Sequence, residues 1–133
     1  MAHLETLQLC EIAFLDSWDR LCLIGVMNRF PVPALPIAVH QLMLVARVVD
    51  ARPGEKIDVG VSITAPSGLS PSPDDPECIE IANLGEYVMI TLRQFPLHEE
   101  GEYRFSLSLT GTDTISLDIP VVLASRPVHA PVH

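Results

Sequence analysis

Residues 103–121 read YRFSLSLTGTDTISLDIPV, and this stretch decides the fold. Apolar side chains alternate with polar ones from Tyr103 to Leu109, and the same alternation returns from Ile115 to Val121. Strict alternation over four or more residues is typical of a strand with one buried face. The polar residues 111–114 between the two runs predict a turn. The stretch therefore predicts two antiparallel strands that share one core-facing side.

The same period of two recurs earlier in the chain, over residues 57–64 and 87–93. Residues 41–49, QLMLVARVV, are apolar on both faces apart from Arg47, which is typical of a central strand covered on both sides. Residues 21–27, LCLIGVM, predict a short buried strand whose glycine marks a bulge or a close backbone approach. Together these segments predict an all-β fold, an antiparallel β-sandwich of about seven to nine strands with little helix.

The 12 prolines lie mostly between the apolar runs. Because proline is excluded from central strands and helix interiors, these clusters predict loops. The segment 30–36, FPVPALP, resembles a polyproline II ligand, but its place inside the domain favours a crossover between two sheets. We expect one domain over residues 1–124, followed by a flexible tail over residues 125–133.

Residues 4–15, LETLQLCEIAFL, fit two structures. A helix gathers Leu4, Leu7 and Phe14 near one face, whereas a strand sends alternate apolar side chains to two faces. The polar turn 16–20, DSWDR, then joins this segment to the next apolar run, as hairpins commonly do. We favour the strand and keep the helix as the alternative.

The chain has 133 residues, of which 48% are hydrophobic, and it carries a formal net charge of −9. That length and composition fit a single globular domain that needs neither a metal nor a disulfide to fold. An acidic protein has no general attraction to phosphate backbones or to anionic lipid. We therefore expect a protein partner or self-association, and neither nucleic acid nor a membrane as a partner.

The chain has three cysteines, Cys10, Cys22 and Cys78, and this odd number argues against a closed disulfide framework. Cys10 and Cys22 lie in apolar surroundings and are expected to be small buried side chains. The first residues lack the basic and apolar regions of a secretory signal. The longest apolar runs fall far short of the ~20 residues that cross a bilayer. We therefore expect a cytoplasmic location.

Two passages resemble known proteins. Residues 9–13 (LCEIA) and 21–30 (LCLIGVMNRF), followed by the prolines of 31–36, resemble the opening of a family of uncharacterised bacterial proteins. Residues 100–107 (EGEYRFSL), with 117–122 (LDIPVV), are similar to the closing hairpin of immunoglobulin-like sandwich domains. The resemblances imply an immunoglobulin-like β-sandwich that is a domain of unknown function, and they carry over no activity.

The sequence holds no glycine-rich phosphate loop, nucleophile elbow or zinc-binding spacing. No catalytic, cofactor-binding or metal-binding residue is therefore predicted, and an enzyme is not favoured. One alternative is a metal-dependent or small-molecule enzyme that uses His40, His98 and nearby acids. Residues 98–102, HEEGE, are otherwise explained as the polar turn before a strand. A second alternative is Ca²⁺ binding by the loop from Asp74 to Glu80, which lacks the spacing of a calcium loop.

Trp18 is the only tryptophan, and it lies in the polar turn between Asp16 and Arg20. Because a tryptophan usually buries most of its surface, its ring is expected either to plug one end of the sandwich or to contact a partner. The predicted partner contact consists of Trp18, Asp16 and Arg20. The function we predict is that of a non-catalytic interaction or structural module, which can also self-associate.

Overall fold

The computed structural model describes residues 2–54, 58–71, 78–109 and 113–124, so the expected tail over residues 125–133 lies outside the described residues. The described residues form ten strands and contain no α-helix, and thus no helix that could cross a membrane. The strands are β1 (His3–Cys10), β2 (Ile12–Leu15), β3 (Leu21–Ile24), β4 (Phe30–Val32), β5 (Ile37–Val49), β6 (Val59–Thr64), β7 (Ile79–Leu84), β8 (Tyr87–Leu97), β9 (Gly101–Leu109) and β10 (Asp113–Leu123).

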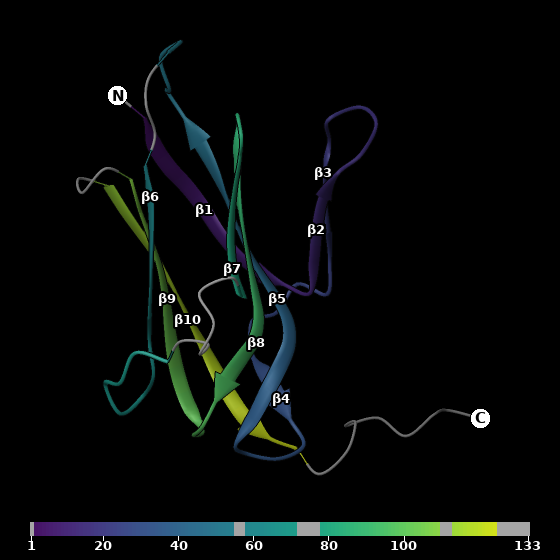
Figure 1. Cartoon of the computed structure of the whole chain (residues 1–133), viewed down its shortest axis with the longest axis vertical. Coiled ribbons are helices and arrows are strands. Elements are labelled where there is room, and N and C mark those ends of the chain that lie inside the picture. The colour runs from purple at the N-terminus through teal and green to yellow at the C-terminus, as the bar shows by residue number, and fades with distance from the viewer. Residues whose placement is uncertain (1, 55–57, 72–77, 110–112, 125–133) are drawn as a thin grey trace.

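Eight of the strands form two sheets that pack face to face. The first sheet has the order β1-β5-β8-β7 and the second has the order β4-β10-β9-β6. Strands β2 and β3 form a separate hairpin, which stands to one side of the two sheets (Figure 1). The first sheet repeats the A-B-E-D order of immunoglobulin domains, and β6, β9 and β10 correspond to their C, F and G strands. The predicted immunoglobulin-like sandwich is confirmed, although β4 and β10 run parallel.

The core lies between the sheets and consists of the inward-facing residues of the alternating strands. Phe105 and Leu107 of β9 belong to the same core cluster as Leu44 and Ile90 of the first sheet, and all four side chains are fully buried. The ring of Phe105 also meets that of Phe95, with centroids 6.3 Å apart. Full burial of each such side chain contributes about 1.5–3 kcal/mol, so the inward-facing residues of the alternating strands stabilise the sandwich strongly.

Tyr103 fixes the turn between β8 and β9. Its hydroxyl accepts hydrogen bonds from the backbone N–H groups of His98 at 3.3 Å and Glu99 at 3.4 Å, and donates to the carbonyl of Glu99 at 3.1 Å. The side chain is only 1% exposed. Immunoglobulin-like domains hold the corresponding corner in the same way.

Residues 4–15 form strands, as expected from the sequence, and the alternative of a helix over these residues is wrong. They form two strands rather than one, because β1 ends at Cys10 and β2 begins at Ile12. Strand β1 pairs with β5 in the first sheet, whereas β2 pairs only with β3 in the described part of the chain. The chain therefore leaves the sandwich at Glu11. The sequence of apolar residues over 4–15 does not predict this break between the two strands.

Strand β5 lies between β1 and β8 and is confirmed as a central strand covered on both sides. Leu42 and Leu44 face the sandwich core, whereas Met43 and Val45 face the hairpin. The proline-bearing segment 30–36 connects β4 of the second sheet to β5 of the first, which confirms the predicted crossover.

Candidate functional site

The β2–β3 hairpin carries all three residues of the predicted partner contact. Its strands pair along their full length, and residues 16–20 close the turn. Gly25 directly follows β3 with a φ of 71°, and a Cβ atom at this position would lie 2.9 Å from Cγ of Glu11. Only glycine adopts this conformation without displacing the Glu11 side chain, so the expected close approach at this glycine is present. The predicted buried strand over residues 21–27 is wrong, because β3 ends at Ile24, and Ile24 and Val26 are both more than half exposed.

The hairpin has two apolar faces, because its residues alternate between the protein and solvent. The packed face lies on the outer side of the first sheet and comprises Ala13, Leu15, Leu21 and Leu23, which meet Cys10, Met43, Val45 and Met89. The outward face comprises Ile12, Phe14, Cys22 and Ile24. Of these, Ile12, Phe14 and Ile24 are between 43% and 52% exposed. The hairpin is therefore a third layer that leaves an apolar surface toward solvent.

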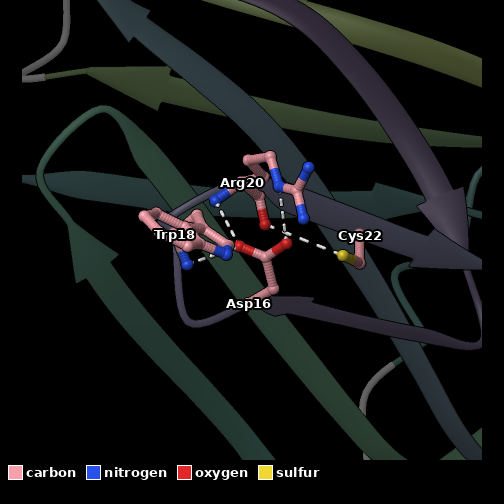
Figure 2. A network of polar contacts seen from close by, with 4 residues as sticks. All are labelled: Asp16, Trp18, Arg20 and Cys22. Atoms are coloured by element: carbon pink, nitrogen blue, oxygen red, sulfur yellow. Dashed lines mark hydrogen bonds and ion pairs between the residues drawn. The ribbon is translucent and has the colours of Figure 1, made fainter.

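Asp16 organises the turn at the tip of the hairpin (Figure 2). Its Oδ1 atom accepts hydrogen bonds from the backbone N–H groups of Trp18 at 2.8 Å and Arg20 at 2.9 Å, and its Oδ2 atom lies 2.7 Å from Nε of Arg20. The hydrogen bond from the Arg20 backbone, with those from Trp18 and the guanidinium, holds the pKa of Asp16 below its usual value. The carboxylate is therefore ionised at neutral pH and keeps the turn in one conformation.

Trp18 projects from this turn and is 79% exposed. The expectation that its ring plugs the sandwich is therefore wrong, because the hairpin carries the turn away from the sheets. Figure 2 shows the indole on one side of Asp16, with Arg20 next to it and Cys22 on the other side. The structure thus brings Asp16, Trp18 and Arg20 together in one exposed turn, and their contact with a partner stays a prediction.

A cleft of about 650 Å³ opens at the base of the hairpin. It is lined by Glu11, Ile12, Gly25, Val26, Met27, Phe30, Pro31, Val39, His40, Gln41 and Leu42. The polar groups are few, and Nε2 of Gln41 donates to the carbonyl of Glu11 at 3.3 Å. Because Ile12 and Val26 are both exposed and line the cleft, the cleft continues the apolar outward surface of the hairpin.

The two histidines of the enzyme alternative do not share a site. His40 lines the cleft, whereas His98 is absent from its lining and follows the end of β8. Leu97 lies opposite Ile37, so His98 is displaced from His40 by at least about 10 Å along the strands, at roughly 3.3 Å per residue. Among the described residues, no group of three His, Cys, Asp or Glu side chains could hold a metal ion.

The acids beside His98 have structural partners. Oε2 of Glu99 accepts a hydrogen bond from Oγ of Ser67 at 2.6 Å, and Oε2 of Glu100 accepts one from the backbone N–H of Leu123 at 3.0 Å. These bonds tie the turn between β8 and β9 to two neighbouring segments. The interpretation of residues 98–102 as a polar turn and strand start is therefore confirmed.

The loop considered for Ca²⁺ runs from Asp74 to Glu80. Residues 72–77 lie outside the described residues, so the Ca²⁺ alternative stays a prediction. Glu80 is described, and its Oε2 atom lies 3.0 Å from Nη2 of Arg93 on the neighbouring strand. This carboxylate already has a cationic partner in the first sheet.

All three cysteines are unpaired. Cys10 is buried as expected, and burial, with the nearby charge of Glu11, raises the pKa of its thiol to about 11. Cys22 is only half-buried, because it lies opposite Phe14 on the outward face of the hairpin. The expectation of a buried Cys22 is wrong, since its apolar sequence neighbours point to the other, packed face.

Sequence reasoning identified the tip of the hairpin but missed its outward face. The available signal was that β2 and β3 are apolar at successive positions, whereas a hairpin with one solvated face alternates with polar residues. An apolar run of this kind is typical of a strand that is buried on both faces. Here one of the two faces is open.

Residues 5–122 match the model of a family described as "Family of unknown function (DUF6941)". No curated protein matches the chain. Among solved structures, the chain is similar to the Ig1 domain of mouse SynCAM 2, with 16% identity over 74% of this chain and 93% of that one and a TM-score of 0.35. The chain is also similar to a C. elegans twitchin kinase fragment, with 13% identity over 74% of this chain and 20% of that one and a TM-score of 0.39. A third similar structure is the M1 domain from titin, with 11% identity over 63% of this chain and 78% of that one and a TM-score of 0.33.

Proposed function

Because the chain belongs to the DUF6941 family, whose function is unknown, we propose a function on the basis of its own geometry. The protein is a non-catalytic module that binds a protein partner through the β2–β3 hairpin. Trp18 forms the tip of the contact, Asp16 and Arg20 flank it, and the outward face of the hairpin extends it. The net charge of −9 disfavours nucleic acid and anionic membranes, which makes a protein the best-suited partner.

The exposure of Trp18 is the observation that carries this proposal. Leaving 79% of an indole side chain in water forgoes hydrophobic free energy that a covering partner recovers. Tryptophan is also strongly enriched among the few residues that dominate the energetics of protein interfaces. At the end of a projecting hairpin, the ring is placed to enter a pocket on another protein.

The surface below Trp18 supports the same proposal. Five of the nine exposed large hydrophobic side chains in the described part of the chain lie on segment 12–26: Ile12, Phe14, Trp18, Ile24 and Val26. Single exposed hydrophobic residues are common on soluble proteins, but a contiguous group marks an interaction surface. The hairpin therefore supplies an aromatic anchor at its tip and an apolar surface along its strands.

The turn also supports the proposal because it is held in place before binding. The carboxylate of Asp16 accepts hydrogen bonds from the backbone N–H groups of Trp18 and Arg20 and from the guanidinium of Arg20. A preorganised turn loses less conformational entropy when a partner binds. Asp16 and Arg20 therefore position Trp18 in addition to bordering the contact.

A reducing, cytoplasmic location is a second part of the proposal. Its support is the unpaired state of Cys10, Cys22 and Cys78, since disulfides persist mainly in oxidising compartments. Fractionation of the host with trapping of free thiols tests it. Recovery of reduced protein from the cytoplasmic fraction is expected, and recovery from an oxidising compartment would overturn this part.

The interaction itself is tested with three tagged baits in extract of the native host: wild type, Trp18→Ala and Leu69→Ala. Leu69 is the matched control because it is 68% exposed on a different loop. We expect wild type and Leu69→Ala to retain a stoichiometric partner, or to form a dimer by light scattering, and Trp18→Ala to lose it. Equal recovery with all three baits would show that the hairpin tip is not the contact.

A further inference from the structure

Strand β3 has a free edge. In the described residues it pairs only with β2. The backbone N–H of Asp16 donates to the carbonyl of Arg20 at 3.0 Å, so these two residues form a hydrogen-bonded pair. In an antiparallel ladder such pairs alternate with pairs that are not hydrogen-bonded, so Phe14 and Cys22 form the next hydrogen-bonded pair. Every second residue of β3 therefore bonds to β2, and the backbone N–H and C=O groups of Leu21 and Leu23 point away from it.

The opposite edge of the hairpin, on β2, contacts the first sheet. By the same alternation, the N–H of Ala13 points outward from β2, where it lies 3.2 Å from Sδ of Met43 on β5. Within the described ranges, the N–H groups of Leu21 and Leu23 have no comparable neighbour. The free edge of the hairpin is therefore that of β3, whereas the edge of β2 contacts β5.

Three outer strands of the two sheets carry features that hinder pairing with a foreign strand. The fourth, β6, exposes only the small or polar Gly60 and Ser62, so it offers an added strand no apolar surface. Strand β1 has an irregular register at Thr6, whose φ is 55°, β4 contains Pro31, and β7 carries Glu80. Bulges, prolines and charges of this kind protect sheet edges. Strand β3, with the sequence LCLI, has none of them. It is the edge best suited to accept an added strand.

We propose that the partner contributes an extended segment that pairs with β3 as an added strand, with alternating apolar side chains and a basic side chain at each end. This inference rests on the interaction function proposed above. Strand addition is a recurring mode of peptide recognition, in which main-chain hydrogen bonds supply affinity and alternate side chains supply specificity. Apolar side chains of the segment extend the surface of Cys22 and Ile24 toward the cleft at the hairpin base.

The basic ends follow from the charges of the hairpin. Residues 11–26 contain three acids, Glu11, Asp16 and Asp19, and one base, Arg20. Asp16 is paired with Arg20, whereas Glu11 at the base and Asp19 at the tip have no ion-pair partner in the part of the chain that the structure describes. Complementary charge at both ends fixes the register of a bound segment and steers its approach.

The test uses the whole protein and a synthetic peptide, Lys-Val-Thr-Val-Thr-Val-Lys, with both termini blocked. Amide exchange is followed residue by residue by NMR. Without peptide, the amides of Leu21 and Leu23 exchange fast and those of Cys22 and Ile24 exchange slowly. With saturating peptide, all four become protected. Fast exchange of Leu21 and Leu23 at saturation would overturn strand addition. Protection in the free protein that is lost on dilution would show a second copy on this edge, and would also overturn it.

Matched peptides and variants separate the backbone from the charges. N-methylation at the peptide bonds that face β3 removes the main-chain donors, and we expect binding about tenfold weaker. The double variant Glu11→Gln/Asp19→Asn should weaken binding about fivefold, because two surface ion pairs are lost and Asn still tolerates the positive φ at position 19. The control Asp58→Asn lies before β6 and should change nothing. Unaltered binding by the N-methylated peptide would overturn strand addition, while the Trp18-dependent capture above would stand.

Discussion

The packed interior and the β2–β3 hairpin each contain an aromatic residue at a turn, and they use it in opposite ways. Each region also contains a cysteine, Cys10 in the interior and Cys22 on the outward face of the hairpin. Tyr103 is buried, and its own hydroxyl holds the turn through three hydrogen bonds. Trp18 is exposed, and the carboxylate of Asp16 holds its turn instead. An aromatic residue that is not needed to hold its turn is available to another molecule.

The largest expected difference between the two regions is in thiol reactivity. Because the thiolate is the reactive form, a pKa raised from 9.0 to about 11 lowers the reaction rate of Cys10 about 100-fold at pH 8. Half-buried Cys22 should react with a maleimide in the folded protein, and Cys10 only on unfolding. Mass spectrometry of the modified peptides measures both rates. Equal rates would mean that the hairpin does not cover Cys10.

Loss of the tyrosine hydroxyl should have the next largest effect. Tyr103→Phe removes three hydrogen bonds to the partly buried backbone of His98 and Glu99, which lowers the free energy of unfolding by about 1–3 kcal/mol. Tyr87→Phe changes the only other tyrosine and is the control, with an expected change below about 0.5 kcal/mol. Urea unfolding followed by circular dichroism measures both. A similar loss in the two variants would show that Tyr103 does not anchor the corner.

The sequence predicts the packed region better than the hairpin, for a physical reason. Residues 103–109 and 113–121 form strands with one face in the core and one in water, so alternation records their environment directly. Residues 12–15 and 21–24 are apolar on both faces, so their pattern is that of a fully buried strand although one face is open. The pattern also gives no sign that the chain leaves the first sheet at Glu11.

The candidate site shows the same limit. Asp16, Trp18 and Arg20 are close in sequence, so a single polar turn was enough to predict that they lie together. The exposure of Trp18 depends on the direction in which the hairpin leaves the first sheet, which long-range packing of Leu21 and Leu23 decides. The free edge of β3 depends on strand pairing across the whole molecule. Neither the exposure of Trp18 nor the free edge of β3 can therefore be predicted from neighbouring residues in the sequence.

Acid should loosen the tip of the hairpin before it unfolds the sandwich. The pKa of Asp16 is lowered in the folded protein, first by the hydrogen bond from the Arg20 backbone. Its stabilising contribution is therefore complete above the unfolded pKa, near 3.9, and is lost as pH falls through the lower folded pKa. Trp18 emission and amide exchange of the turn should report this transition. In Asp16→Asn the transition should be absent, and its persistence there would assign it to another group.

Removal of the exposed indole should have the smallest effect on the fold. Trp18→Ala takes away a side chain with few contacts, so the free energy of unfolding should change by less than about 0.5 kcal/mol. Thermal unfolding beside the wild type measures this. A loss comparable to that of Tyr103→Phe would mean that the indole packs on the protein.

Fluorescence of Trp18 tests the central claim most directly, because it is the only tryptophan in the chain. Emission and acrylamide quenching are measured on the dilute protein alone and after addition of the purified partner. The account predicts the emission and quenching of an exposed indole in the free protein, then a shift to shorter wavelength and protection from acrylamide in the complex. Emission of a shielded indole in the dilute free protein, or no change in the complex, would contradict the account.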